Sequence, residues 1–138
     1  KYAMGSSYFD QMRIAVPKLM KDRNLKKPCS LYQDDDFGRE VLAGAEAGVQ
    51  SLSVSLSSRV SYQRGTTDFS AQMKQLKAGG CDLVVLGTVI RETAGAMAEA
   101  EKIGFRPTFL ANNGVYSDVV LKVGGSTVEG LYAAMTAQ

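Results

Sequence analysis

The chain has 138 residues with 16 basic and 14 acidic side chains, which give a net charge of +2. This length fits one domain with a single core, and the scattered basic residues predict no nucleic acid partner. With no histidine and only two cysteines, a histidine-activated nucleophile is impossible and a zinc site would lack ligands. The composition therefore predicts neither a metal nor another cofactor.

No segment reaches the roughly 18 to 20 uninterrupted apolar residues that a membrane helix requires. Residues 1–10 lack the layout of a signal peptide. A signal can be removed from a mature product, so the compartment is not fixed by this observation.

The first elements are a helix and a strand. Apolar residues keep helical spacing from residue 6 to residue 24, and two serines at the start of this segment precede the first turn. Pro17 lies inside this pattern and predicts a kink or two shorter helices, because proline removes a backbone hydrogen bond. The apolar run at 29–32 then predicts a short strand.

A second helix starts near Phe37 and keeps apolar residues on one face as far as Val49. Gly44 and Gly48 lie one turn apart beside that face, and glycine is costly in a helix, so they predict a close approach to the sheet. In the following "SLSVSLSS", leucine and valine alternate with serine, which predicts a strand at 52–56 near a sheet edge.

The third helix is predicted after Thr66-Thr67-Asp68, which can cap its start. Its inward residues are Phe69, Met73 and Leu76, and Gly79-Gly80 ends it in a left-handed turn. The run Leu83 to Leu86 is apolar at successive positions, which is typical of a central parallel strand covered on both faces. Four elements complete the pattern: a helix at 92–103, a strand at 108–111, a short helix at 117–123 and a strand at 130–135.

Strand and helix alternate five times, which predicts an α/β fold with a doubly wound parallel five-stranded sheet in a three-layer α/β/α arrangement. We expect the strand order 2-1-3-4-5 and one Rossmann-like domain over residues 1–138. In such folds ligands bind beyond the carboxyl ends of the strands. The loops at 33–38, 87–91 and 111–116 are therefore the candidate ligand loops.

Three consecutive aspartates, Asp34 to Asp36, follow the first predicted strand. A phospho-acceptor receiver domain would use such a group to hold magnesium, but its acceptor aspartate would end the third strand, which here ends Leu86-Gly87-Thr88. A hydrolase that used these aspartates as nucleophile and acid would also lack partner residues. At least one aspartate is expected to cap the following helix instead, and we predict no enzymatic activity.

Four segments in order resemble one family: "LYQDDDFGREVLAGAEAG", "GTTDFSAQMKQLKAGGCDLVVLG", "EAEKIGFRPTFLANNGV" and "GGSTVEGLYAA". They are similar to type I periplasmic solute-binding proteins of the leucine/isoleucine/valine-binding kind, the extracytoplasmic receptors of ABC importers. The resemblance extends from about Tyr8 to the end. It implies a lobe of a two-lobed protein, matching the second lobe only, with the other lobe and the closing C-terminal segment absent.

The same resemblance implies a ligand site. Family contacts fall on Phe37 after the first strand and near Val89 after the third, and the acidic residue of amino-acid binders falls on Asn113. Arg91 could pair with a ligand carboxylate, and Tyr116 could add an aromatic wall. The alternatives are a hydrophobic staple for Phe37, a solvated helix-start cation for Arg91 and a simple turn at Asn113.

Cys29 and Cys81 open neighbouring strands in the expected order, so the two thiols could meet at the end of the sheet remote from the ligand loops. A disulfide and two buried free cysteines both remain open.

The resemblance implies solute capture for an ABC-type uptake system, in the periplasm or on a lipid anchor outside the cytoplasm. The expected partners are a small amino acid or organic or aromatic acid, the membrane permease and the missing lobe. A sensory ligand-binding ectodomain of the same fold is the alternative, and an exposed hinge face would allow self-association.

Overall fold

The computed structural model describes residues 8–112 and 131–134. Helices and strands alternate as follows: α1 (Tyr8–Arg23), β1 (Pro28–Gln33), α2 (Asp36–Gln50), β2 (Ser58–Tyr62), α3 (Ser70–Ala78), β3 (Leu83–Gly87), α4 (Ile90–Lys102), β4 (Thr108–Asn112) and β5 (Leu131–Ala134). Five strands form one parallel sheet in the order β2-β1-β3-β4-β5. The predicted fold class and strand order are confirmed. The predicted helix at 117–123 lies outside the described residues.

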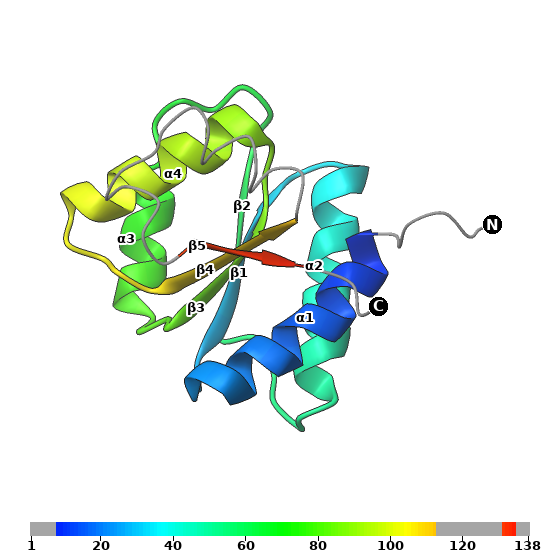
Figure 1. The fold of residues 1–138 in the computed structure, drawn as a ribbon. Helices are drawn as coiled ribbons and strands as arrows, with labels where there is room; N and C mark the ends of the chain where they lie inside the picture. The colour runs from blue at the N-terminus through cyan, green and yellow to red at the C-terminus, as the bar shows by residue number, and fades with distance from the viewer. Residues whose placement is uncertain (1–7, 113–130, 135–138) are drawn as a thin grey trace.

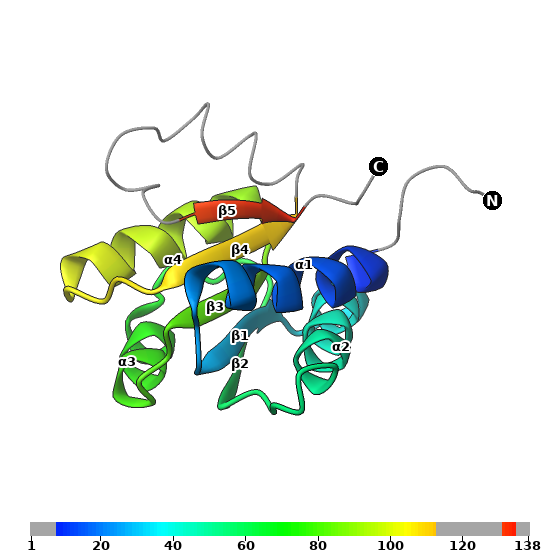
Figure 2. The same ribbon diagram turned by 60° about the horizontal axis from the view of Figure 1, so that its bottom comes forward.

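Two helical layers enclose the sheet. Helices α1 and α2 cover one face, and α3 and α4 cover the other (Figures 1 and 2). Strand β3 explains this arrangement, since all five of its residues are buried. Leu83 and Val85 point into the core under α1 and α2, while Val84 and Leu86 belong to the core under α3 and α4. A strand with two covered faces needs an apolar residue at every position.

The predicted strand at 52–56 is wrong. Backbone N–H groups of Leu52 and Val54 both donate to the Val49 carbonyl and close a turn after α2, while Ser53 has a positive φ of 60°. Leu56 is buried beneath α1 and α2. The alternation of apolar residue and serine therefore describes a loop that inserts side chains into this core. The edge strand β2 begins at Ser58 instead.

Helix α1 continues through Pro17, so of the two predicted outcomes the division into two shorter helices is wrong, and the kink stays a prediction. The proline ring lies against α2, since a Cβ added at Gly48 would be 3.0 Å from Pro17 Cδ and 3.2 Å from the Arg13 carbonyl oxygen. A Cβ at Gly44 would likewise be 2.5 Å from the Phe9 carbonyl oxygen. The two glycines therefore allow close contact between helices, whereas the sequence predicted contact with the sheet.

The predicted third helix is confirmed, with Phe69, Met73 and Leu76 buried. Asp68 Oδ1 accepts a hydrogen bond of 2.9 Å from the Ser70 N–H at its start, and this bond lowers the pKa of Asp68. Gly80 has a φ of 72° at its end, as the left-handed stop requires. None of the helices within residues 8–112 is both long enough and apolar enough to cross a membrane.

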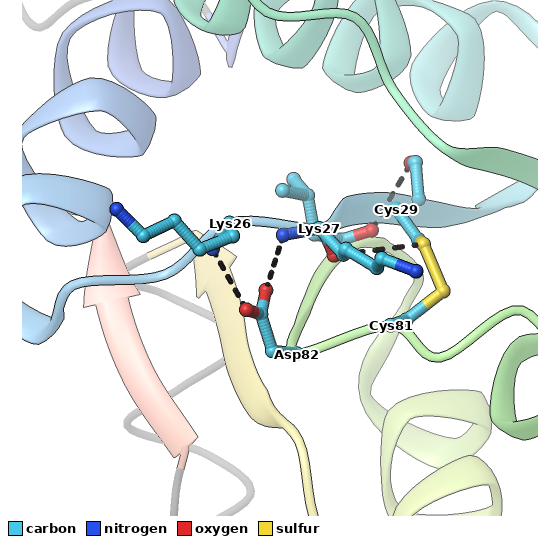
Figure 3. Close-up of a disulfide and its surroundings, with 7 residues drawn as sticks. Lys26, Lys27, Cys29, Cys81 and Asp82 are labelled. Carbon is cyan, nitrogen blue, oxygen red and sulfur yellow. Dashed lines mark hydrogen bonds between the residues drawn. A yellow bond between two sulfur atoms is a disulfide. The ribbon is translucent and has the colours of Figure 1, made fainter.

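Cys29 and Cys81 form a disulfide, with their Cα atoms 6.0 Å apart. The bridge lies at the amino end of the sheet, where β1 and β3 begin (Figure 3). Beside it the Asp82 carboxylate accepts hydrogen bonds of 2.7 and 2.8 Å from the backbone N–H groups of Lys26 and Lys27. The structure thus resolves the choice left open by the sequence in favour of the disulfide.

Candidate functional site

The candidate site is the carboxyl end of the sheet, where the loops after β1, β2 and β3 lie. The strand order reverses between β1 and β3, which are paired in the middle of the sheet. The helix after β1 covers one face and the helix after β3 covers the other (Figure 2). In such sheets the usual ligand position is the space between loops that diverge in this way.

Asp35 fixes the loop after β1. It is the N-cap residue of α2, and its Oδ1 accepts a 2.9 Å hydrogen bond from the Gly38 N–H. Its Oδ2 accepts a hydrogen bond from the side-chain amide of Gln33, the last residue of β1. The Gly38 N–H is the main cause that lowers the pKa of Asp35 below 3.8; partial burial opposes it and Gln33 adds to it. The predicted capping role is confirmed.

Gly38 brings the start of α2 directly over the end of β1. A Cβ at this position would lie only 1.8 Å from the Gln33 carbonyl oxygen, so no larger residue fits there without moving the backbone. A Cβ at Gly87 would lie 3.1 Å from the Gly38 carbonyl oxygen. The first turn of α2 and the end of β3 are therefore adjacent.

The other two aspartates make local contacts. Asp34 forms an ion pair with Arg39 and accepts a 3.3 Å hydrogen bond from the Gln63 side chain. Asp36 is fully exposed, 3.9 Å from Arg39. Asp34 and Asp35 thus hold the loop in place.

Tyr62 joins the edge strand to this network. Its hydroxyl donates a 3.3 Å hydrogen bond to Gln33 Oε1, and its ring packs edge-on against Phe69 at 5.2 Å between centroids. Burial raises the pKa of Tyr62, the negative charge of Glu92 adds to this, and the Val89 backbone N–H opposes it. The phenol is therefore held in its neutral, donating form.

Glu92 ties the loop after β2 to α4. Its side chain is buried in the first turn of α4, and its Oε2 accepts a 3.3 Å hydrogen bond from the Gly65 N–H. Gly65 has a positive φ of 89°, which glycine adopts without strain. The loops after β1 and β2 are thus both held by side-chain hydrogen bonds.

The loop after β3 is held by threonines. Thr93 uses its backbone N–H and its hydroxyl to bond the Val89 carbonyl, both at 2.8 Å. Its hydroxyl also contacts the buried hydroxyl of Thr88. Val89 occupies the N-cap position of α4 in an extended conformation and is half-buried. The backbone at the start of α4 is therefore fixed by Thr93.

Three predicted site residues lie at this end of the sheet. Phe37 is in the first turn of α2, is half-buried and packs against the core under α1 and α2. Val89 is the N-cap residue of α4, and Arg91 lies in the first turn of this helix, where it is exposed. Asn113 and Tyr116 lie outside the described residues. The ligand role of all five residues stays a prediction.

Sequence reasoning missed Gln33, Tyr62 and Glu92. Because a strand was assigned to 52–56, Tyr62 fell in a predicted loop, although the alternating burial of Val60 and Tyr62 is a strand pattern. Gln33 gave a weaker signal, a polar residue at the end of an apolar run. Glu92 was taken only as a helix-start residue.

Two shallow hollows lie at the opposite end of the sheet. One of about 380 Å³ lies between the second half of α2 and the start of β2, and its charged residues Glu46 and Arg59 are paired with each other. The other, of about 370 Å³, lies between the end of α1 and residues 52–54. Within the described part of the chain, no group of three His, Cys, Asp or Glu side chains could hold a metal ion.

Comparison with known proteins gives a consistent result. A family profile described as "Periplasmic binding protein" matches residues 2–138. Among curated relatives, Leu/Ile/Val-binding protein homolog 7 of Brucella suis is 27% identical over 104 residues, which are 75% of this chain and 26% of that protein. The chain therefore spans about a quarter of the length of this relative.

Solved structures with the same fold include a fatty acid ABC transporter substrate-binding protein from Thermomonospora curvata, with a TM-score of 0.81 and 21% identity. The match covers 94% of this chain and 34% of that one. A solute-binding protein of an ABC transporter from Rhodopseudomonas palustris, in complex with 4-hydroxybenzoate, has a TM-score of 0.73 and 18% identity over 88% of this chain and 34% of that one. At these identities the likeness concerns the fold alone.

Proposed function

The chain belongs to the periplasmic binding protein family, and from this we propose that it is one lobe of a receptor that captures a small solute for an ABC-type uptake system. The solute would bind between the carboxyl end of this sheet and a second lobe, without chemical change. Binding between two lobes buries most of a small ligand and excludes water when the lobes close.

The rigid strand-end loops carry this proposal. The network of Asp35, Gln33 and Tyr62 holds the loop after β1, and Thr93 holds the loop after β3. A binding site gains affinity when its groups are already fixed, because ordering them on binding would cost free energy. Phe37 and Val89 begin the helices that these loops precede, and we assign them the ligand contacts on this lobe.

Both this chain and its relatives favour a solute that carries a carboxylate. Leucine, isoleucine and valine, fatty acids and 4-hydroxybenzoate all carry one, as the names of the related proteins indicate. Exposed Arg91 can pair with a carboxylate in a two-pronged geometry. Asn113 replaces the acidic residue that the family resemblance implies for an ammonium group, which favours organic or aromatic acids over simple amino acids. Tyr116 would add an aromatic wall.

We place the protein outside the cytoplasm, in the periplasm or on a lipid anchor. The Cys29–Cys81 disulfide supports this placement, because such bonds persist in oxidising compartments and are rare in the cytosol. The permease of the importer and the second lobe are the partners that follow from the proposal.

A thermal-shift screen of the native polypeptide tests the proposal. Amino acids, aromatic acids and dicarboxylates are added in parallel, and we expect one class of carboxylate to raise Tm. Replacing the charge in Arg91→Gln should weaken binding of that compound about tenfold, since hydrogen bonds to charged groups are strong. Arg106→Gln is the matched control, because Arg106 is also exposed but precedes β4 at the opposite end of the sheet.

Three results would count against the proposal. Stabilisation by α-amino acids alone would contradict the role given to Asn113. Equal affinity of the Arg91→Gln and Arg106→Gln variants would remove Arg91 from the site. Turnover of any added compound would show that the protein is an enzyme and not a passive receptor.

A further inference from the structure

Tyr8 opens α1 beside Phe37, at the same end of the sheet as the proposed site. Because α1 precedes β1 in the chain, its first turn lies where the strands end (Figure 1). The two rings meet edge-to-face, with centroids 5.0 Å apart and an interplanar angle of 86°. This is a favourable geometry for an aromatic pair.

The pair is held firmly by its two helices. The Phe9 N–H donates a 3.2 Å hydrogen bond to Glu40 Oε2, which joins the first turn of α1 to α2. Gly44 lets the helices approach so closely that an added Cβ would collide with the Phe9 backbone. The first turn of α1, which carries Tyr8, is therefore packed closely against α2 beside Phe37.

Tyr8 is also the one exposed large hydrophobic side chain among the described residues, with 39% of its surface accessible. An aromatic pair with a purely structural role is expected to cover both rings, as in the pair of Tyr62 and Phe69, each of which is 2% exposed. Here Phe37 is packed against the core, whereas Tyr8 keeps much of its surface open. A rigid, partly open aromatic ring beside a binding site offers contact area at little entropic cost.

We propose that Tyr8 determines specificity by extending the aromatic wall begun by Phe37, so that the site prefers an acid with a planar, unsaturated ring to a small aliphatic amino acid. This inference rests on the proposed function, because it assigns Tyr8 to the same site. The sequence and the family resemblance did not single out Tyr8.

The test measures calorimetric affinity of the native polypeptide for benzoate and for leucine. Tyr8→Ala should weaken benzoate binding about two- to tenfold, the range expected for one lost aromatic contact, and should change leucine binding less. Tyr8→Phe keeps the ring and should bind benzoate as the wild type does. Lys18→Ala is the control on α1, because Lys18 is 77% exposed and lies three turns from Tyr8.

The outcomes separate this inference from the proposed function. If the wild type binds benzoate and Tyr8→Ala binds it equally well, the role of Tyr8 is wrong while solute capture stands. The same holds if leucine is the only ligand, or if Tyr8→Phe is as impaired as Tyr8→Ala. If neither probe nor any acid in the thermal-shift screen binds, both proposals fail. Thermal melts of each variant exclude unfolding as the cause.

Discussion

The amino end of the sheet is held together by a covalent bond, whereas the described loops at the carboxyl end are held by hydrogen bonds and by the ion pairs of Arg39 with Asp34 and Asp36. At the amino end, Cys29 and Cys81 join β1 to the start of β3, and the Asp82 carboxylate binds two consecutive backbone N–H groups. At the carboxyl end, a chain of hydrogen bonds joins the start of α2 to the ends of β1 and β2 through Asp35, Gln33 and Tyr62.

Under the proposed function, this difference assigns stability to one end of the domain and ligand recognition to the other. A disulfide stabilises mainly by constraining the unfolded chain, so it stabilises the fold even at an end of the sheet that takes no part in binding. The hydrogen-bonded loops at the other end fix the backbone next to Phe37 and Val89, the residues to which we assign the ligand contacts. The amino end should therefore govern global stability, and the carboxyl end should govern the geometry of binding.

Removing the disulfide is expected to have the largest effect. The bond closes a loop of 52 residues in sequence separation, and losing such a bond typically costs about 2–5 kcal/mol of unfolding free energy. Reductant should lower the stability of the wild type by that amount in chemical denaturation. Alanine is preferred to serine in a double variant because Cys29 and Cys81 are buried.

The Cys29→Ala/Cys81→Ala double variant is the control. It should start at the reduced stability and should not respond to reductant. A wild type that gains no mass on reduction, or whose denaturation curve is the same with and without reductant, would show that the bond does not form. The affinity for a bound acid should change little, because the bridge is remote from the proposed site.

A glycine pair gives the next test of the comparison. Gly38→Ala places a methyl group 1.8 Å from the Gln33 carbonyl oxygen, and forced backbone shifts of this kind cost about 1–3 kcal/mol. Gly79→Ala is the matched change at the amino end, where φ is −75° and the nearest atom is the Ser58 hydroxyl at 3.2 Å. Its stability should change by less than about 1 kcal/mol. Equal losses for the two variants in denaturant melts would contradict the predicted asymmetry.

The layers and strand order followed from the sequence because their signals are local and strong. Strand β3 is apolar at each of Leu83 to Leu86, and only a strand covered on both faces requires that pattern. The prediction of a strand at 52–56 was wrong for a physical reason, since a loop that buries Leu56 produces the same alternation of apolar and polar residues as a strand. The spacing of apolar residues indicates which side chains are buried, but it does not by itself indicate which backbone segments pair as strands.

The site was predicted less completely because it depends on register. Gln33 and Tyr62 are partners across β1 and β2, and no spacing within one segment shows that the amide and phenol meet. The capping role of the aspartates was local and was predicted correctly. Asn113 and Tyr116 stay predictions, because they lie outside the described residues.

Asp35 provides the smallest and most specific test. Its folded pKa is lowered, chiefly by the Gly38 N–H, so the ionised carboxylate stabilises the fold above the unfolded pKa near 3.8 and this contribution is lost as pH falls through the folded pKa. Asp35→Ala should cost about 1 kcal/mol at pH 7, as for other lost N-caps, and the gap from wild type should shrink below pH 3.8 in acid-dependent melts.

Asp35→Asn separates the cap from the charge. Its amide oxygen can still accept the Gly38 N–H, but its NH₂ group would face the donating amide of Gln33, so one of the two hydrogen bonds of Asp35 is lost. We expect an intermediate stability at pH 7. A loss that stays constant from pH 7 to pH 3 in Asp35→Ala would contradict the carboxylate role, because an uncharged contact does not titrate. A pH-dependent gap would instead show that this loop is held by ionised Asp35, as its hydrogen bonds to Gly38 and Gln33 require.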